Sequence, residues 1–205
     1  MIAIIDYGVG NLFSLKSSFR ALGAEIAVTS DPEVIKTADK LILPGVGAFG
    51  DAAQLLRKDG MDQLIRREAE MGKPLLGICL GMQLLFEESL EYGRHAGLGL
   101  LPGSVVPIAD AIPKGLKIPH IGWNALHFPK DMAPSPLFRH IKENDCVYFV
   151  HSYYAANCAD SVIATAEYGA ELTAAAARDN VFGVQFHPEK SGEVGLNILR
   201  AFCEL

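Results

Sequence analysis

The hydrophobic positions near the start of the chain form a short apolar run followed by a helical stripe. Ile2–Ile5 is apolar at every position, which is typical of a strand covered on both faces. After a polar, glycine-containing break, Asn11 is a favourable N-cap and Gly23 is a favourable stop for a helix. The stripe between them consists of Leu12, Leu15, Phe19 and Leu22. The pattern predicts a strand, a turn and a helix.

The same alternation continues to about residue 88. The predicted strands are Glu25–Thr29, Lys40–Leu43 and Pro74–Cys79. The predicted helices are a short one that starts at Asp31-Pro32, one over Asp51–Met71 that is broken near Gly60, and one over Met82–Glu88. Strands that alternate with helices imply a mostly parallel sheet with helices on both faces.

After about Tyr92 the chain is rich in proline, and the alternation stops. The predicted strands here are Leu116–His120, Cys146–Val150, Val162–Ala166 and Val181–Phe186, and a helix is predicted over Glu193–Cys203. We find no linker and no repeat in this half. We therefore expect it to decorate a single α/β domain that spans residues 1–205.

Composition excludes several classes of protein. The 205 residues are 50% hydrophobic, enough for a sizeable core, and the net charge of -6 argues against a nucleic-acid surface. The apolar start lacks a basic leader, and no apolar stretch approaches the roughly 20 residues of a membrane span. The cysteines are scattered, without a C-x-x-C pair, which argues against a disulfide scaffold or a zinc knuckle. They are Cys79, Cys146, Cys158 and Cys203. We expect a cytoplasmic protein.

The strongest chemical signal is the sequence Gly77-Ile78-Cys79-Leu80-Gly81, between a predicted buried strand and a helix. It is the cysteine form of the nucleophile elbow, in which flanking glycines let a strained turn fit between sheet and helix. Cys79 would lie at a helix N-terminus, which favours its thiolate, and the Leu80 amide would point at a developing oxyanion. The alternative is a structural cysteine packed as a small hydrophobe.

A second motif, His187-Pro188-Glu189, ends the last predicted strand. Residues two apart on an extended chain project to the same side, and a proline keeps the residue before it extended. We therefore expect His187 and Glu189 to face the nucleophile together, as a base and the carboxylate that orients it. A loop histidine beside a surface glutamate is the alternative for this motif alone. Two such motifs that end strands of one domain favour catalysis.

Glycine-rich backbone also follows the predicted strand Lys40–Leu43, as Pro44-Gly45-Val46-Gly47. Ligands of open parallel sheets bind at the carboxyl ends of strands, so these N–H groups can serve an oxyanion or a carboxylate. A phosphate loop is the alternative. Neither G-K-[ST] nor G-x-G-x-x-G is present, which argues against it.

These motifs, with Met82-Gln83 and His151-Ser152-Tyr153, resemble the triad-type (class I) glutamine amidotransferases. Residues 6–12, 119–124 and 186–191 further resemble the glutaminase subunits of imidazole glycerol phosphate synthases, which serve histidine biosynthesis. The resemblance extends from residue 6 to residue 191. It implies a flavodoxin-like α/β fold with an open, mostly parallel but mixed twisted sheet.

The resemblance also implies a reaction. Cys79 attacks the side-chain amide of glutamine, His187 transfers a proton to the departing ammonia, and Glu189 orients the imidazole. The glutamyl thioester is then hydrolysed to glutamate. The oxyanion donors implied are the amides of Leu80 and of the segment Gly45, Val46 and Gly47. The groups implied to bind glutamine are Gln83 and the backbone at Ser152 and Tyr153.

A partner is implied in the same way, because the chain has no domain that would use ammonia. In this family the partner is a (β/α)-barrel cyclase, which receives ammonia through a tunnel and makes imidazole glycerol phosphate and AICAR from PRFAR. Asn11, Trp123 and Lys190 match the docking face, although core packing is the alternative for the single tryptophan. The family has weak glutaminase activity until the partner binds its ligand, and Gly45 and Gly47 have the backbone freedom for such a change.

No metal or cofactor is implied. The histidines at 95, 120, 127 and 140 show no ligand spacing and are expected to be structural or surface groups. Another cysteine hydrolase, such as a small peptidase or a deglycase-like protein, would lack the H-P-E motif, and a binding module would lack a triad member. The glutaminase partners of anthranilate synthase and pyridoxal phosphate synthase are nearer rivals. The G-W-N and H-P-E-K-S sequences argue against both.

Overall fold

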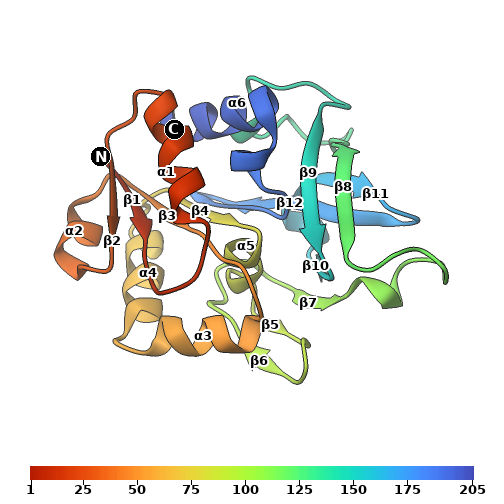
Figure 1. The fold of residues 1–205 in the computed structure, drawn as a ribbon, viewed down its shortest axis with the longest axis horizontal. Helices are drawn as coiled ribbons and strands as arrows, with labels where there is room; N and C mark the ends of the chain where they lie inside the picture. The colour runs from red at the N-terminus through yellow and green to blue at the C-terminus, as the bar shows by residue number, and fades with distance from the viewer.

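A seven-stranded sheet with the order β11-β12-β13-β4-β3-β1-β2 forms the centre of the computed structural model, which describes residues 1–205 (Figure 1). Its parallel strands are β1 (Ile2–Ile5), β2 (Ile26–Thr29), β3 (Lys40–Leu43), β4 (Leu75–Ile78) and β13 (Val181–Val184). The antiparallel strands β11 (Val162–Glu167) and β12 (Glu171–Arg178) extend one edge. The parallel order, second-first-third-fourth-fifth, is that of flavodoxin-like sheets. The predicted fold class is confirmed.

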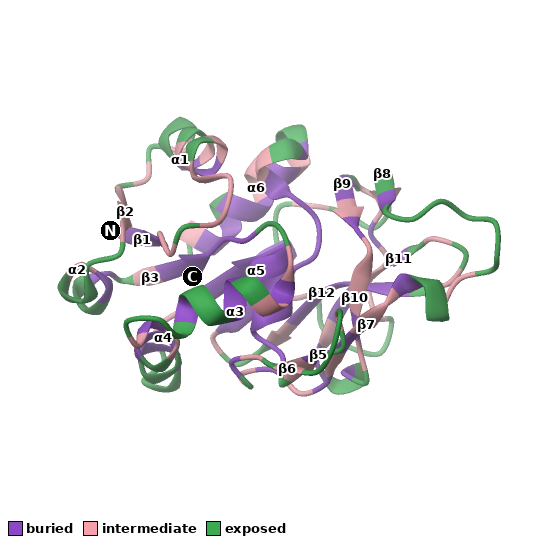
Figure 2. Ribbon diagram, turned by 60° about the horizontal axis from the view of Figure 1, so that its bottom comes forward, coloured by how far each residue is buried: buried purple, intermediate pink, exposed green.

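Helices cover both faces of this sheet. The helices α1 (Leu12–Ala21) and α6 (Gly192–Cys203) pack together on one face. The other face carries α2 (Pro32–Thr37), α3 (Phe49–Arg57), α4 (Met61–Glu70) and α5 (Leu80–Leu84). Strands β1, β4 and β13 are therefore buried at every position, whereas the edge strand β2 is only half-buried (Figure 2). Within β1, Ile2 and Ile4 face the first layer, and Ala3 and Ile5 face the second.

Local capping explains where the first helices begin. The side chain of Asn11 accepts a hydrogen bond from the Ser14 amide at 3.3 Å, as expected of the N-cap of α1. Asp31 caps α2 in the same way, with Pro32 at the first helical position. Gly60, with φ of 70°, separates α3 from α4, as the break in the helical pattern predicts.

The second half of the chain adds two small sheets. One has the order β10-β7-β5-β6, from β5 (Glu88–Ser89), β6 (His95–Ala96), β7 (Ser104–Pro107) and β10 (Tyr153–Ala156). The other pairs β8 (His120–Ala125) with β9 (Cys146–His151). Four short 3-10 helices are η1 (Ile108–Asp110), η2 (Pro136–Phe138), η3 (Ala159–Ser161) and η4 (Pro188–Lys190). None of the helices is long and apolar enough to cross a membrane.

Three predicted elements are wrong in their extent. The helix expected over Met82–Glu88 starts at Leu80 and ends at Leu84, because the carbonyls of Leu84 and Leu85 accept hydrogen bonds from residues 98–101 instead. The run Leu116–His120 is irregular until His120, and its Pro119 has no N–H to donate to a strand partner. The final strand, expected over Val181–Phe186, ends at Val184.

Candidate active site

The carboxyl ends of β3, β4 and β13 bring the three motifs together. β4 lies between the other two strands, and the amide of Cys79 donates to the Val184 carbonyl at 2.8 Å. The glycine-rich segment after β3, the cysteine after β4 and the histidine after β13 therefore meet at one edge of the sheet. This is the edge at which open α/β sheets bind ligands.

Cys79 occupies a strained turn between β4 and α5. Its φ of 54° and ψ of -111° lie outside the regions that residues with side chains ordinarily adopt. A Cβ at Gly77 would lie 2.6 Å from the Gly81 carbonyl oxygen, and a Cβ at Gly81 only 1.8 Å from the Leu43 carbonyl oxygen. This crowding explains the glycines on both sides of the cysteine, and it holds the thiol at the start of α5.

The backbone around the thiol offers hydrogen-bond donors. Leu80 is the first residue of α5, so its N–H has no acceptor within the helix. Gly45 packs against this turn so closely that a Cβ there would lie 2.8 Å from the Gly81 nitrogen. Gly47 alone of the two segment glycines has a positive φ, of 94°. Gly47 thus has a conformation that favours glycine, and Gly45 is required for close packing.

Tyr7 contacts the start of the glycine-rich segment Pro44–Gly47 through a hydrogen bond. Its hydroxyl donates to the Pro44 carbonyl at 2.8 Å. Burial raises the pKa of Tyr7, and the nearby charge of Cys79 raises it further, so the hydroxyl keeps its proton.

His187 and Glu189 form a buried ion pair. The distance between His187 Nδ1 and Glu189 Oε1 is 2.8 Å, and the side chains are only 4% and 2% exposed. Burial lowers the pKa of His187, but hydrogen bonds to Cys79 and Glu189 and the charges of both outweigh it and raise the pKa to about 9. Contrary to expectation, the pair does not share an extended strand, because Glu189 lies in η4 and approaches the ring from within that turn.

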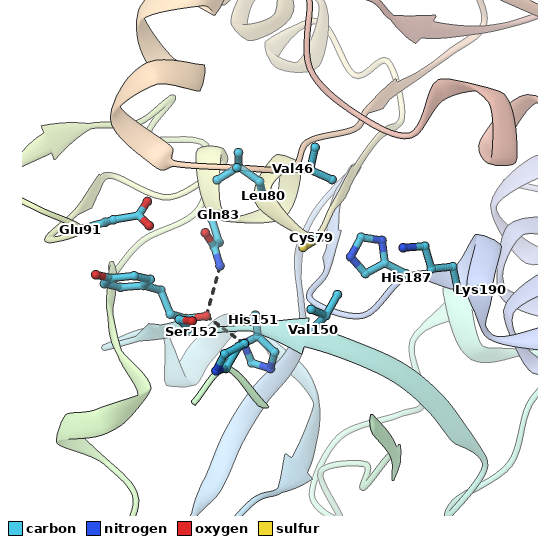
Figure 3. Close-up of a pocket in the computed structure, with 13 residues that line it drawn as sticks. Val46, Cys79, Leu80, Gln83, Glu91, Val150, His151, Ser152, His187 and Lys190 are labelled. Carbon is cyan, nitrogen blue, oxygen red and sulfur yellow. Dashed lines mark hydrogen bonds between the residues drawn. The ribbon is translucent and has the colours of Figure 1, made fainter. Parts of the chain in front are cut away.

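The thiol and the imidazole lie at one end of a pocket with a volume of about 320 Å³ (Figure 3). Gln83, Glu91 and Ser152 lie at the other end, and Val46 is drawn above Cys79 in this view. The remaining lining residues are Gly47, Leu80, Pro119, Val150, His151, Tyr153 and Lys190. Every predicted catalytic and glutamine-binding residue therefore lines one cavity, except Gly45 and Glu189, which are buried behind it.

Two polar residues near this cavity were not predicted from the sequence. Glu91 is the only acidic residue that lines the pocket, and it also accepts a hydrogen bond from the Phe49 amide. Gln185 is fully buried beside Cys79 and Gln83. Glu91 follows a two-residue strand in an irregular segment, where no sequence pattern identifies it. Gln185 lies two residues before His187, and that spacing was the only available signal.

The side chain of Gln83 is held by two hydrogen bonds at the pocket. Its side-chain nitrogen donates to the Tyr153 carbonyl at 3.1 Å and to Gln185 Oε1 at 3.0 Å. Both N–H groups are therefore used, which leaves the Gln83 carbonyl oxygen as the polar group available to a ligand.

Of the predicted docking residues, Lys190 lines the pocket, whereas Trp123 and Asn11 lie outside its lining. Trp123 was expected in an irregular segment but lies in β8, where it is 56% exposed and meets the Tyr148 ring edge-on at 6.0 Å. The Lys190 ammonium lies 6.0 Å from the centre of the same ring. No hydrogen bond joins Asn11, the cap of α1, to either residue. The core-packing alternative for Trp123 is thus wrong.

The other histidines have structural surroundings. His120 is buried between His151, at 3.1 Å, and Asn124, at 2.9 Å, and burial lowers the pKa of both imidazoles, that of His151 to about 4. His127 and His140 pair with carboxylates near the surface. No group of three or more His, Cys, Asp or Glu side chains is arranged to hold a metal ion.

Together, a strained cysteine, an imidazole with a buried carboxylate, and free backbone donors on a flavodoxin-like sheet define a cysteine-dependent acyl transferase or hydrolase. The profile of the family "Glutamine amidotransferase class-I" matches residues 3–204. The chain therefore belongs to the class-I glutamine amidotransferases.

Full-length relatives narrow the comparison. The chain is 53% identical over 206 residues to a protein of Caldanaerobacter subterraneus subsp. tengcongensis, which covers 100% of this chain and 98% of the relative. It is 50% identical to a protein of Methanothermobacter thermautotrophicus, again over 100% and 98% of the two chains. Both relatives are named "Imidazole glycerol phosphate synthase subunit HisH".

Solved structures agree on the fold. A structure of PurLQS from Thermotoga maritima superposes with a TM-score of 0.77 at 21% identity, over 99% of this chain and 97% of the other. A "glutamine amidotransferase" crystal structure gives a TM-score of 0.76 at 21% identity, over 100% and 98%.

Proposed function

We propose that this chain is the glutaminase subunit of an imidazole glycerol phosphate synthase, with Cys79, His187 and Glu189 as its catalytic triad. The observation that carries the triad is the buried His187–Glu189 pair on the strand next to the one that presents Cys79. The names of the relatives at about 50% identity support the choice of synthase.

The reaction follows from these groups. The Cys79 thiolate attacks the carboxamide carbon of glutamine, and the Leu80 amide and the segment Gly45–Gly47 stabilise the oxyanion. The His187 imidazolium gives its proton to the nitrogen, the C–N bond breaks, and ammonia leaves a glutamyl thioester. His187, now neutral, takes a proton from water as the water attacks the thioester. Glutamate leaves, and the thiolate–imidazolium pair is restored.

The far end of the pocket suits the amino-acid end of glutamine. The Glu91 carboxylate complements the α-ammonium, and backbone N–H groups near Ser152 and Tyr153 complement the α-carboxylate. The free carbonyl oxygen of Gln83 accepts from the ligand. The mixture of one carboxylate and many backbone groups disfavours a phosphate or a peptide chain as the substrate.

Ammonia must reach an acceptor before water protonates it, and the relatives at about 50% identity are named as a subunit of a synthase. We therefore propose a heterodimer with a (β/α)-barrel cyclase that takes ammonia through an internal channel, and the lyase activity belongs to that complex. Exposed Trp123 and Lys190, which both lie against the Tyr148 ring, support a docking face there, to which we also assign Asn11. The match over residues 3–204 supports one amidotransferase domain, and four free cysteines are compatible with a cytoplasmic location.

Replacing Cys79 with alanine tests this function. In the complex with the cyclase, Cys79→Ala should abolish glutamine-dependent product formation and leave ammonia-dependent formation intact. Cys146→Ala, at an exposed cysteine outside the pocket, is the matched control and should change neither rate. Glutamine turnover that survives Cys79→Ala would show that another nucleophile acts. Co-purification with a chorismate-binding synthase instead of a barrel cyclase would overturn the choice of partner.

A further inference from the structure

Gln185 is a buried amide that the mechanism above does not use. It follows β13, has no exposed surface, and is held by a backbone hydrogen bond from its N–H to the Ala174 carbonyl at 2.8 Å. Its side-chain nitrogen lies 3.8 Å from Cys79 Sγ, and its side-chain oxygen lies 3.0 Å from the Gln83 side-chain nitrogen. The nucleophile thus has a polar neighbour in addition to His187.

The hydrogen-bond network determines which end of this amide faces the sulfur. The Tyr153 carbonyl can only accept, so the Gln83 side chain must present its nitrogen there, at 3.1 Å. The same Gln83 nitrogen also faces Gln185, so Gln185 must present its oxygen to Gln83. The N–H groups of Gln185 are then directed to Cys79. Turning either amide around would place two acceptors or two donors against each other in the buried interior.

We propose that Gln185 is a catalytic residue that donates a hydrogen bond to the Cys79 sulfur and stabilises its thiolate. A charged sulfur accepts such a bond more strongly than a neutral thiol or a thioester does. The bond therefore favours the attacking form of Cys79 and weakens when the thioester forms. This inference rests on the proposed function, in which Cys79 is the nucleophile.

The network also explains why an amide serves here better than a charged group. A lysine or arginine at position 185 would add a buried cation beside the His187 imidazolium, and like charges destabilise each other in a buried site. An amide supplies a directed donor without adding charge. Its orientation is set by Gln83, which lines the pocket, so one chain of hydrogen bonds joins the nucleophile to the proposed substrate site.

The test measures the reactivity of Cys79 without glutamine. Iodoacetamide alkylation of Cys79 is followed by peptide mass spectrometry from about pH 5.5 to about pH 9.5, with the exposed Cys146 as a reference in the same sample. Gln185→Met keeps the length of the side chain and removes the donor. We expect Cys79 alkylation near pH 7 to slow roughly tenfold, and its pH midpoint to rise. Gln185→Glu, which places a carboxylate beside the sulfur, should slow it at least as much.

A matched control removes the threonine hydroxyl that lies beside a different buried cysteine, Cys158. Thr173 Oγ1 lies 3.7 Å from the sulfur of Cys158, so Thr173→Val should leave the Cys79 profile unchanged. A wild-type Cys79 profile in Gln185→Met, with Cys146 reactivity unaltered, would overturn the inference. If Gln185→Met does not fold, a wild-type Cys79 profile in the isosteric Gln185→Glu overturns the inference instead. A Cys79 no more reactive than Cys146 in the wild-type protein would instead count against the proposed function itself.

Discussion

Replacing Glu189 with glutamine separates the charge of this side chain from its shape. In the folded protein its carboxylate oxygen lies 2.8 Å from His187 Nδ1, and both side chains are almost completely buried. Glutamine has the same size and can still accept from Nδ1–H. Any change in the titration of His187 therefore reports the lost negative charge.

The expected fall in the pKa of His187 follows from the distance between the two charges. Two unit charges about 4 Å apart, at an effective dielectric constant of about 20, attract by about 4 kcal/mol, which corresponds to about 3 pKa units. The pKa of His187 is raised to about 9 in the wild-type site. We expect it to fall to about 6 in Glu189→Gln. Near pH 7.5 the imidazole would then be neutral, and Cys79 would lose the cation that favours its thiolate.

The raised pKa of His187 also makes the free energy of unfolding depend on pH. The folded pKa of about 9 lies above the ordinary value of 6.5, so protonated His187 stabilises the fold fully below about pH 6.5. That contribution is lost as the pH rises through about 9. The free energy of unfolding of Glu189→Gln should lack this loss between the two pH values.

The assay is an NMR titration of ring-labelled histidine, together with glutaminase kinetics. We expect kcat near pH 7.5 to fall at least about 100-fold, with KM changed by less than about threefold, since a triad carboxylate acts on the imidazole rather than on substrate binding. Glu204→Gln is the matched control, because it removes a carboxylate 2.6 Å from the more exposed His140. If His187 in Glu189→Gln still titrates within about half a unit of the wild-type value, the charge argument is refuted.

Two further predictions concern a buried ion pair and a close backbone contact. Lys73→Met should lower the free energy of unfolding in urea by about 3 kcal/mol, because the Glu68 carboxylate, which is 5% exposed, loses the ammonium at 2.8 Å and keeps only the more distant Arg67 at 3.9 Å. Lys36→Met, which breaks an exposed pair, should cost less than about 1 kcal/mol, and equal losses would contradict the role of burial. Gly45→Ala should lower kcat at least about tenfold with an unchanged circular dichroism spectrum, since its Cβ would meet the first turn of α5 at 2.8 Å; unaltered kcat would show that the segment adapts.

Local chemistry explains what could be predicted. Apolar runs such as Ile2–Ile5 and caps such as Asn11 act over a few residues, so the pattern alone identified the parallel strands and most helices. Strand β12 was missed because Glu171–Arg178 contains four consecutive alanines, and alanine favours helices where no neighbouring strand imposes pairing. The four strands of the β10-β7-β5-β6 sheet have two to four residues each, too few to show a period.

The cysteine elbow with which the chemistry begins was determined by the sequence itself, because its glycines and its strand-to-helix change lie within a few residues of Cys79. The tertiary structure decided the rest of the site. Glu189 reaches His187 from a 3-10 turn, and Glu91 enters the pocket from a loop. Gln185 is directed at the sulfur because Gln83, which donates to the Tyr153 carbonyl, fixes its orientation. Those contacts depend on strand order and on backbone positions far apart in the chain, which no local pattern of residues records.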